Sequence, residues 1–375
     1  MKKEENFSKN LFTNIKNSDR FFVELTIALA ALGLIFAFTS STWLSQKYTG
    51  HFWFLWFKQF IAFIIGFILL VWFSRIKYKF WYKLTWFLYI SMVLLMTVTL
   101  VIGKTSGGST RWIDLGFIQF QPAEVAKLSI LLLAARYLIN FKPFEKRTLI
   151  YILFSMILIG LVFKQPDLGS AAILVLLLLQ LFFVFGFPAH ILLLSTTAIG
   201  LFGLFEIFKT SYQLARIEFW LNPYKDPQGK GYNLIQAKYA FGLGGLWGAG
   251  IGNSVQKKYG HLPVPHADFI FAIIAEEIGF IGVTAILILF AAWTLRGLYL
   301  INKIENKYGR ILGSGIVFLI ITQTIINLAV SVGLFPVTGV TLPFFSCGGT
   351  SLIVTLAMCG ILFNIVSSEK KDVKA

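Results

Sequence analysis

Acidic and basic side chains that could do chemistry gather in a few short segments between long apolar runs. The richest segment is 209–277, whose ionisable residues include Arg216, Lys257, Lys258, Asp268, Glu276 and Glu277. Asp268 stands where a deep apolar run begins, a position that also suits a helix N-cap. Two adjacent glutamates further along that run must face protein, water or a cation, because lipid does not solvate them. The segment predicts a polar cavity that opens to the outside, with groups suited to acid–base and ion-binding chemistry.

A second polar segment surrounds the start of the apolar run at 122–139. Arg111 lies in RWIDLG, and Glu124 and Lys127 lie in QPAEVAK. Glu124 and Lys127 are three residues apart, so they share one helix face and can pair. The alternative to a functional role is a capped, internally paired helix start, with Pro122 in its first turn.

Three other segments have a structural and a functional interpretation. Asp167 in KQPDLG could cap the helix that follows it. The glycine-rich run 242–252 lacks the dinucleotide-binding pattern and instead permits tight turns or close approach of backbone to a lipid or sugar. His261 and His266 have the wrong spacing for one helix face and no cysteine nearby, so we expect no metal site there.

The elements that position these residues are membrane helices. The chain has 375 residues, a formal charge of +16, 57% hydrophobic residues and only 13% charged residues. Soluble globular domains have about a quarter of their residues charged, so a soluble enzyme is excluded. A nucleic-acid partner is also disfavoured, because Lys and Arg form small groups between apolar runs rather than one solvated face. Cys347 and Cys359 are too few for a disulfide framework.

Apolar runs long enough to span a bilayer predict an all-α polytopic membrane protein with about ten transmembrane helices. The runs are 21–44, 57–73, 82–102, 122–139, 148–163, 169–187, 189–208, 268–298, 311–334 and 350–366. The fifth and sixth are short or broken by Gly and Pro. We expect one membrane domain at 21–366, with a large extracytoplasmic loop at 209–267 between helices 7 and 8. The stretch 333–351 is broken by Gly and Pro and should fold back into the protein, because its freed backbone groups need partners.

Lys and Arg decide the orientation. They are abundant in both tails (1–20 and 367–375) and in the loops at 74–81, 140–147 and 299–310, and sparse in the short loops between them. The positive-inside rule therefore places both termini in the cytoplasm. The long segment 209–267 is also basic, but long loops report orientation weakly.

Four motifs in this order resemble the SEDS family (shape, elongation, division and sporulation proteins) across about residues 21–366. They are the RWIDLG and QPAEVAK pair, KQPDLG, the block from GY-x-x-x-QA through QKK-x-GHLP-x-PHADFIFAIIAEE, and GLFPVTGVTLPFFSCGGTSL. The second half resembles the division branch of the family more than its elongation branch. The sequence departs from the usual pattern at Ala123, Asn233, Ala267, Cys347 and Thr350, and none of these changes removes a charged group.

The resemblance implies a peptidoglycan glycosyltransferase of the cell membrane that polymerises lipid II during septal wall synthesis. It also implies a class B penicillin-binding transpeptidase as partner, together with other division proteins and membrane lipids. Asp268 matches the family's essential carboxylate, and we expect it to act as general base in an inverting transfer. The pyrophosphates need cationic partners, for which Arg111, Lys127, Arg216, Lys257 and Lys258 are candidates, with a divalent cation (Mg²⁺ or Mn²⁺) as a further option.

Three alternatives fit the same residues. A lipid II flippase would also need polar groups in a bundle of broken helices, although transport sites usually lie near the midplane whereas these residues crowd the outer side. A non-catalytic scaffold could activate the partner. An elongation-type glycosyltransferase would perform the same reaction elsewhere on the cell surface.

Overall fold

The computed structural model is almost entirely helical and describes residues 18–106, 109–114, 116, 119–209, 211–229, 231–258 and 268–372. Its long helices are α3 (Arg20–Thr49), α4 (Phe54–Phe73), α5 (Lys79–Ile102), α6 (Pro122–Tyr137), α7 (Lys146–Lys164), α8 (Leu168–Val184), α9 (Ala189–Lys209), α13 (Ile270–Asn302), α14 (Lys307–Ser331) and α15 (Gly349–Asp372). Shorter elements are α10 (Ser211–Leu221), η1 (Pro223–Lys225), α11 (Tyr232–Gly244) and α12 (Val255–Lys258).

Each of the ten predicted apolar runs coincides with one of the long helices. Seven helices within the described ranges are long and apolar enough to cross a membrane, and the apolar parts of α8 and α9 are shorter. The tenth, α6, has 16 residues. An all-α multi-pass membrane protein is confirmed, whereas ten as the number of crossings stays a prediction.

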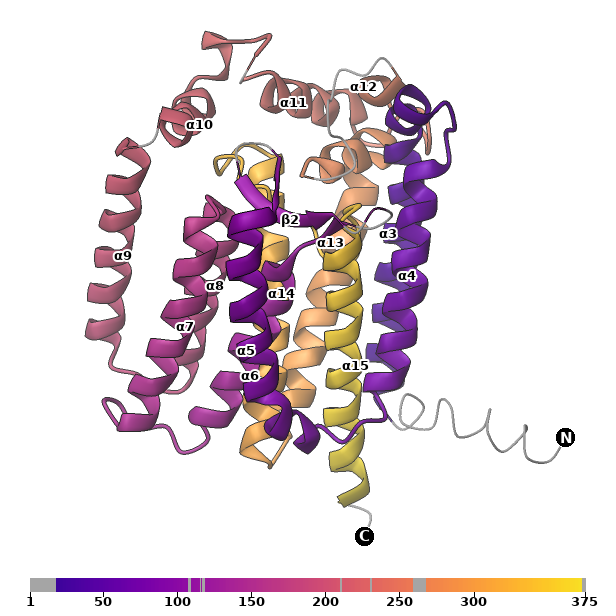
Figure 1. Cartoon of the computed structure of the whole chain (residues 1–375). Coiled ribbons are helices and arrows are strands. Elements are labelled where there is room, and N and C mark those ends of the chain that lie inside the picture. Colours follow the sequence, from indigo (N-terminus) through magenta and orange to yellow (C-terminus); the bar gives the residue numbers. More distant parts are fainter. Residues whose placement is uncertain are drawn as a thin grey trace, which may run out of the picture.

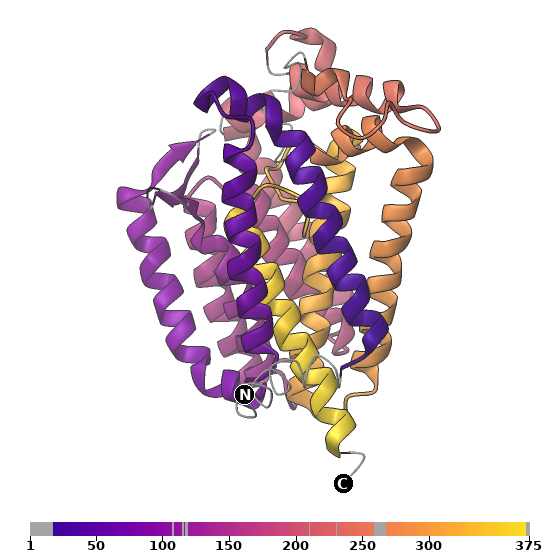
Figure 2. The ribbon, with the colours of Figure 1, turned by 90° about the vertical axis from the view of Figure 1, so that its right-hand side faces the viewer.

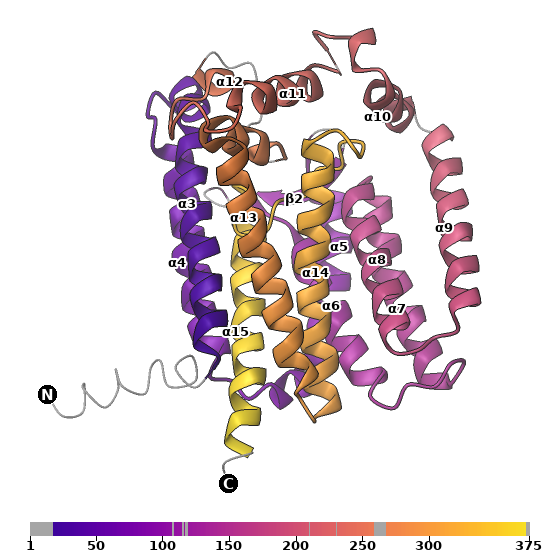
Figure 3. The ribbon, with the colours of Figure 1, turned by 180° about the vertical axis from the view of Figure 1, so that it is seen from behind.

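The long helices stand side by side, and the polar elements gather at one end of the bundle. Figure 1 shows β2, α10, α11 and α12 at the end opposite to the start of α3 and the end of α15, and the views in Figures 2 and 3 agree. This arrangement matches the expectation that successive loops lie at alternate ends of the bundle. The side of a membrane on which each end lies is a prediction from the basic residues.

Three helices form the interior of the bundle. Nearly every residue of α6 is buried, and most residues of α14 and α15 are buried as well. Burial on all sides means that other helices surround these three. Close approach in the tightest pair, α4 with α15, depends on glycine, because a Cβ on Gly360 would lie 2.4 Å from the Leu70 carbonyl oxygen.

A small antiparallel sheet precedes α6, where the sequence indicated only a polar segment. Its strands β1 (Lys104–Ser106), β2 (Ser109–Asp114) and β3 (Gln119–Phe120) are ordered β1-β2-β3, with Lys104 opposite Trp112 and Ile113 opposite Phe120. Strands of two to six residues are too short to show an alternating pattern. The sheet holds Arg111 in the middle of β2.

The expected single helix at 268–298 is broken in the structure. Gly279 has φ 65° and ψ −172°, so α13 consists of an outer part, 270–278, and a long part that begins after this glycine. The backbone released at the break pairs with the glycine-rich loop: Ala249 N donates to Glu276 O (2.8 Å), and Phe280 N donates to Gly245 O (2.9 Å). The glycines of 242–252 thus allow tight turns, as expected, and the backbone they approach is that of α13.

The segment 332–348 between α14 and α15 folds back into the protein, as predicted. Phe344 and Phe345 are buried within it. A Cβ on Gly33 of α3 would lie 2.1 Å from the Phe344 carbonyl oxygen, and a Cβ on Gly169 of α8 would lie 2.3 Å from that of Thr338. The segment therefore packs against the middle of α3 and the start of α8.

Candidate active site

Asp268 lies immediately ahead of the outer part of α13 and is half-buried. Its backbone carbonyl accepts hydrogen bonds from Asn327 Nδ2 (3.1 Å) and from Ser331 Oγ (3.4 Å), both on α14. Asp268 is therefore held by α14 through its main chain, and these two bonds do not use its carboxylate.

Arg111 reaches the same region from β2. Its Nη1 lies 3.3 Å from Asp167 Oδ1, with 17% of the Arg111 side chain and 1% of the Asp167 side chain exposed. The guanidinium group also lies against Gly339, where a Cβ would be 3.2 Å from both Nη1 and Nη2. Glycine at this position leaves room for the charged group.

Asp167 is fully engaged by its neighbours. It caps α8 by accepting from Ser170 N (3.1 Å), and it also accepts from Ser170 Oγ (2.9 Å) and from Gln121 Nε2 (3.2 Å). The predicted capping role is confirmed. With Arg111 added, the two carboxylate oxygens have four partners, so Asp167 holds Arg111 in place.

The charges around Asp268 act in opposite directions on its acidity. Burial raises the pKa of the Asp268 carboxyl above its ordinary value, and the nearby negative charge of Asp167 raises it further. The positive charges of Arg111 and Arg216 lower that pKa. Desolvation makes a carboxylate more basic, while the two guanidinium groups favour its ionised form. The result is a carboxylate suited to accept a proton.

Arg216 therefore belongs to the same electrostatic neighbourhood as Asp268 and Arg111. It lies on the short helix α10, which follows α9 in the sequence, and it is partly buried. Three segments far apart in the sequence thus place two cations and one carboxylate within electrostatic reach of each other.

Glu124 and Lys127 form the ion pair that their spacing predicts. Lys127 Nζ lies 2.6 Å from Glu124 Oε1, and the exposed fractions of the two side chains are 2% and 8%. The pair sits in the first turns of α6, where Pro122 occupies the N-terminal turn. A role in substrate binding stays a prediction for both residues.

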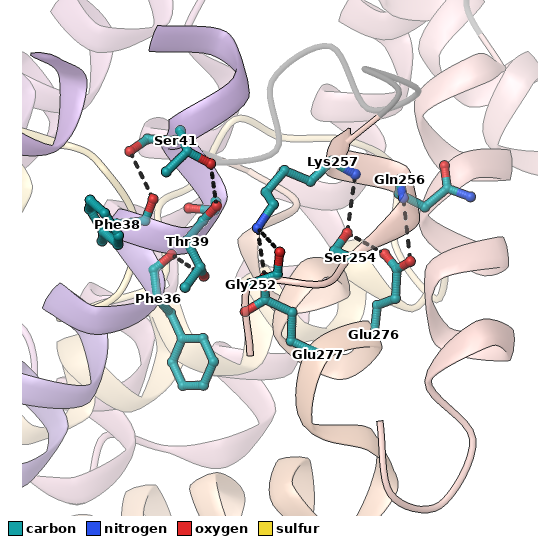
Figure 4. Close-up of polar contacts among 12 residues, drawn as sticks. Phe36, Phe38, Thr39, Ser41, Gly252, Ser254, Gln256, Lys257, Glu276 and Glu277 are labelled. Carbon is teal, nitrogen blue, oxygen red and sulfur yellow. Dashed lines mark hydrogen bonds and ion pairs between the residues drawn. The ribbon is translucent and has the colours of Figure 1, made fainter. Parts of the chain in front are cut away.

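Lys257, Glu276 and Glu277 form a separate buried network that joins the glycine-rich loop to the break in α13 (Figure 4). Lys257 Nζ lies 3.1 Å from Glu277 Oε1 and donates to Gly252 O (3.0 Å). Glu276 accepts from Ser254 Oγ (2.5 Å) and from Val255 N (2.6 Å). These side chains have protein partners, and their predicted contact with substrate is untested.

Four residues named from the sequence lie wholly or partly outside the described residues. They are His261, His266 and Ala267, and the side chain of Lys258. The structure adds three residues that the sequence did not mark as site residues. The sequence indicated Asp167 only as a possible helix cap, and it assigned no role to Asn327 or Gly339. The costly polar side chain of Asn327 in a membrane helix was the strongest available signal.

The donors near Asp268 do not fit a resident divalent cation. Both oxygens of Asp167 already accept hydrogen bonds or an ion pair, which leaves Asp268 as the one available carboxylate of the two. Within the described ranges, no group of three His, Cys, Asp or Glu side chains is placed to hold a metal. Mg²⁺ needs several oxygen ligands, so a cation here would depend on oxygens from a bound molecule.

Comparison with known proteins places the chain in a family. Residues 19–371 match the FtsW, RodA and SpoVE family model, described as cell cycle protein. The chain is 35% identical over 357 residues to the probable peptidoglycan glycosyltransferase FtsW of Trichlorobacter lovleyi, with 92% of each chain covered. It is 36% identical to the stage V sporulation protein E of Bacillus subtilis, covering 94% of this chain and 98% of that protein.

Solved structures give the same result. One, described as showing the structural coordination of polymerization and crosslinking by a peptidoglycan synthase complex, has a TM-score of 0.77 at 30% identity and covers 93% of this chain and 97% of that one. The rod shape determining protein RodA of Thermus thermophilus has a TM-score of 0.70 at 28% identity, covering 94% and 97%. The resemblance of the four motifs is thereby confirmed, and this chain belongs to the FtsW, RodA and SpoVE family of cell cycle proteins.

Proposed function

We infer that this chain is a peptidoglycan glycosyltransferase of the FtsW type, which polymerises lipid II at the outer face of the cell membrane during septal wall synthesis. The names of its FtsW relatives support the activity. The observation that carries the proposal is the half-buried carboxylate of Asp268 within electrostatic reach of the charges of Arg111 and Arg216. A transfer between two pyrophosphate-linked sugars needs a base that accepts the hydroxyl proton and cations that bind the pyrophosphates.

Asp268 acts as the general base. The 4-hydroxyl of the GlcNAc of an incoming lipid II attacks the anomeric carbon of the MurNAc at the end of the growing chain. A new C–O bond forms with inversion, and the hydroxyl proton goes to the Asp268 carboxylate. The bond to the undecaprenyl pyrophosphate breaks, and the pyrophosphate leaves with the electron pair. The raised pKa of Asp268 brings its basicity closer to what proton transfer at neutral pH requires.

Cations bind the pyrophosphates and stabilise the charge that develops on the leaving group. Arg111 and Arg216 are the first candidates, because their charges reach Asp268. Lys127 and Lys257 are buried with glutamate partners, so we propose that they, with Glu124, Glu276 and Glu277, contribute through the shape of the site. Lys258 remains a candidate on sequence grounds.

A divalent cation remains a proposal, and it would share its coordination with pyrophosphate oxygens, since the described part of the chain offers too few ligands near Asp268. Removal of divalent ions by a chelator, followed by titration of Mg²⁺ and Mn²⁺, measures this dependence directly.

The partner is a class B penicillin-binding transpeptidase. One similar structure is described as coordinating polymerization and crosslinking, which supports a joint machine. We place the complex at the division septum together with other division membrane proteins, and both termini of this chain in the cytoplasm.

The deciding experiment is polymerisation of lipid II by the purified chain with its transpeptidase partner. Asp268→Asn keeps the shape of the side chain and removes the base, so we expect the rate to fall at least about 100-fold. Asp226→Asn, in the same loop region, serves as the matched control and should retain activity. Undiminished polymer from Asp268→Asn contradicts the catalytic assignment.

The same preparation separates the enzyme from the alternatives. Transbilayer movement of labelled lipid II in liposomes, without polymer, would favour the flippase. A stable complex with the partner in which even the wild-type chain makes no polymer would favour the scaffold.

A further inference from the structure

Asn327 connects three segments that meet at the candidate site. Its Nδ2 donates to the carbonyl oxygens of Asp268 (3.1 Å) and Val340 (2.8 Å), while the residue itself belongs to α14. One amide group therefore ties the start of α13 to the segment 332–348. Both of its amide hydrogens are used in these two bonds.

The second bond leads to Arg111. Val340 follows Gly339, whose Cα faces the guanidinium of Arg111 so closely that a Cβ would lie 3.2 Å from both terminal nitrogens. The backbone at this point fixes how far the guanidinium can extend. Asn327 thus sets the position of Asp268 through one bond. Through the other it sets the position of the backbone at Gly339 and Val340, which contacts the guanidinium of Arg111.

Asn327 is buried, so the loss of its two hydrogen bonds would cost free energy. Only 1% of the residue is exposed, and its Oδ1 has no hydrogen-bond partner among the described residues. A buried polar group with an unsatisfied acceptor costs free energy. A residue used only for packing at this position would be apolar, as its neighbours Ile326 and Leu328 are.

We propose that Asn327 is a positioning residue that holds the carboxylate of Asp268 and the guanidinium of Arg111 at the spacing the transfer reaction requires. The proposal rests on the proposed function, since it assigns a task within that reaction. Asn327 does not itself touch the reacting atoms.

The chain offers a matched control in Asn364 of α15. Asn364 is 2% exposed and also bridges two backbone groups, accepting from Tyr78 N (2.8 Å) and donating to Ser74 O (2.7 Å). These contacts lie at the opposite end of the bundle, at the turn between α4 and α5. Asn327→Leu and Asn364→Leu therefore each remove two buried bonds between a side chain and the backbone. Only the bonds of Asn327 lie beside Asp268.

The test measures kcat, KM and the pH dependence of lipid II polymerisation for both variants, with thermal unfolding in detergent as the measure of folding. We expect both variants to unfold at lower temperature. Asn327→Leu alone should lower kcat at least about tenfold and move the acidic limb of the pH profile to higher pH. Among the described residues, the charged groups that act on Asp268 are Arg111 on β2, Arg216 on α10 and Asp167 before α8. A weaker hold on Arg111 reduces the positive charge that favours the ionised carboxylate.

A rescue variant keeps the test decisive. Asn327→Asp supplies a donor only while the new carboxyl is protonated, so its activity should exceed that of Asn327→Leu at mildly acidic pH and fall as the pH rises. The proposal is overturned if a folded Asn327→Leu matches the Asn364 variant in kcat and pH profile. A wild-type chain that makes no polymer would instead contradict the proposed function, so the two failures are distinct.

Discussion

The proposed reactivity of Asp268 depends on the charges around it, and two of these are guanidinium groups. Arg216 is half-buried on the short helix α10, and Arg111 is half-buried on β2, where it pairs with Asp167. The two guanidinium groups act on the same carboxyl from different segments. Their separate contributions can therefore be measured.

Removal of the positive charge at Arg216 should change the pH at which activity is lost. The working form of Asp268 is ionised, and the Arg216 charge lowers the pKa of its carboxyl. Arg216→Gln raises that pKa, so activity should disappear at a higher pH on acidification. A pH–rate profile of polymerisation measures the shift. Lys225→Gln, an exposed cation in the same loop region that pairs with Glu218, should leave the profile unchanged, and equal shifts in both variants would contradict the assignment.

At the level of the elements, the outer part of α13 is held at both of its ends. Its start is fixed to α14 through the carbonyl of Asp268. Its other end is fixed to the glycine-rich loop by backbone bonds and by the network of Lys257, Glu276 and Glu277. The loop is therefore part of the support of the candidate base.

Loss of the Lys257 charge should destabilise the protein strongly. Lys257→Met leaves the carboxylate of Glu277, which is 1% exposed, without its cation, and breaking a buried pair in this way costs about 3–5 kcal/mol. Thermal unfolding in detergent measures the loss. Lys209→Met, which breaks an exposed pair with Glu206, should cost less than about 1 kcal/mol.

A double variant checks that the two charges act together. Lys257→Met combined with Glu277→Gln removes both charges, so it should recover much of the stability lost in the single variant. Independent, additive losses would show that the pair is not coupled.

The sequence was informative about the helices and much less so about what joins them. Apolar runs located all ten long helices, because a helix in lipid must satisfy its backbone internally and so leaves a long apolar pattern. The spacing of Glu124 and Lys127 predicted their ion pair. The break at Gly279 was missed, because one glycine in an apolar run does not reveal that a distant loop pairs with the released backbone.

The candidate site depends on contacts between segments far apart in sequence, and this limits prediction from local patterns. The partnership of Arg111 with Asp167 joins β2 to the turn before α8, and Asn327 joins α14 to residues on both sides of it. Local signals marked these residues as polar in apolar surroundings. They could not say which of them meet, so Asp167 remained a helix cap and Lys257 a substrate contact.

For the whole molecule, the loops at the two ends of the bundle imply a definite topology. The segment between α10 and α11 and the turn between α7 and α8 lie at one end, whereas the turn after α13 and the start of α9 lie at the other (Figures 1 and 3). In that order these four places contain Tyr224, Pro166, Lys303 and His190. With ten crossings and cytoplasmic termini, the first two positions face outward and the last two face inward.

Single cysteines test this topology in a variant that lacks both native thiols. A membrane-impermeant maleimide added to intact cells should label Tyr224→Cys and Pro166→Cys and leave Lys303→Cys and His190→Cys unlabelled until the membrane is opened. Outside labelling of His190→Cys would show that α8 or α9, whose apolar parts are shorter, does not cross.

The break in α13 also bears on how the protein fits a bilayer. The apolar stretch of α13 between Glu277 and Arg296, residues 278–295, is about 27 Å long at 1.5 Å per residue, close to a hydrocarbon core of about 30 Å. Because the helix breaks at Gly279, this long part can take its own tilt. The outer part keeps its attachment to α14, so a change in membrane thickness need not displace Asp268.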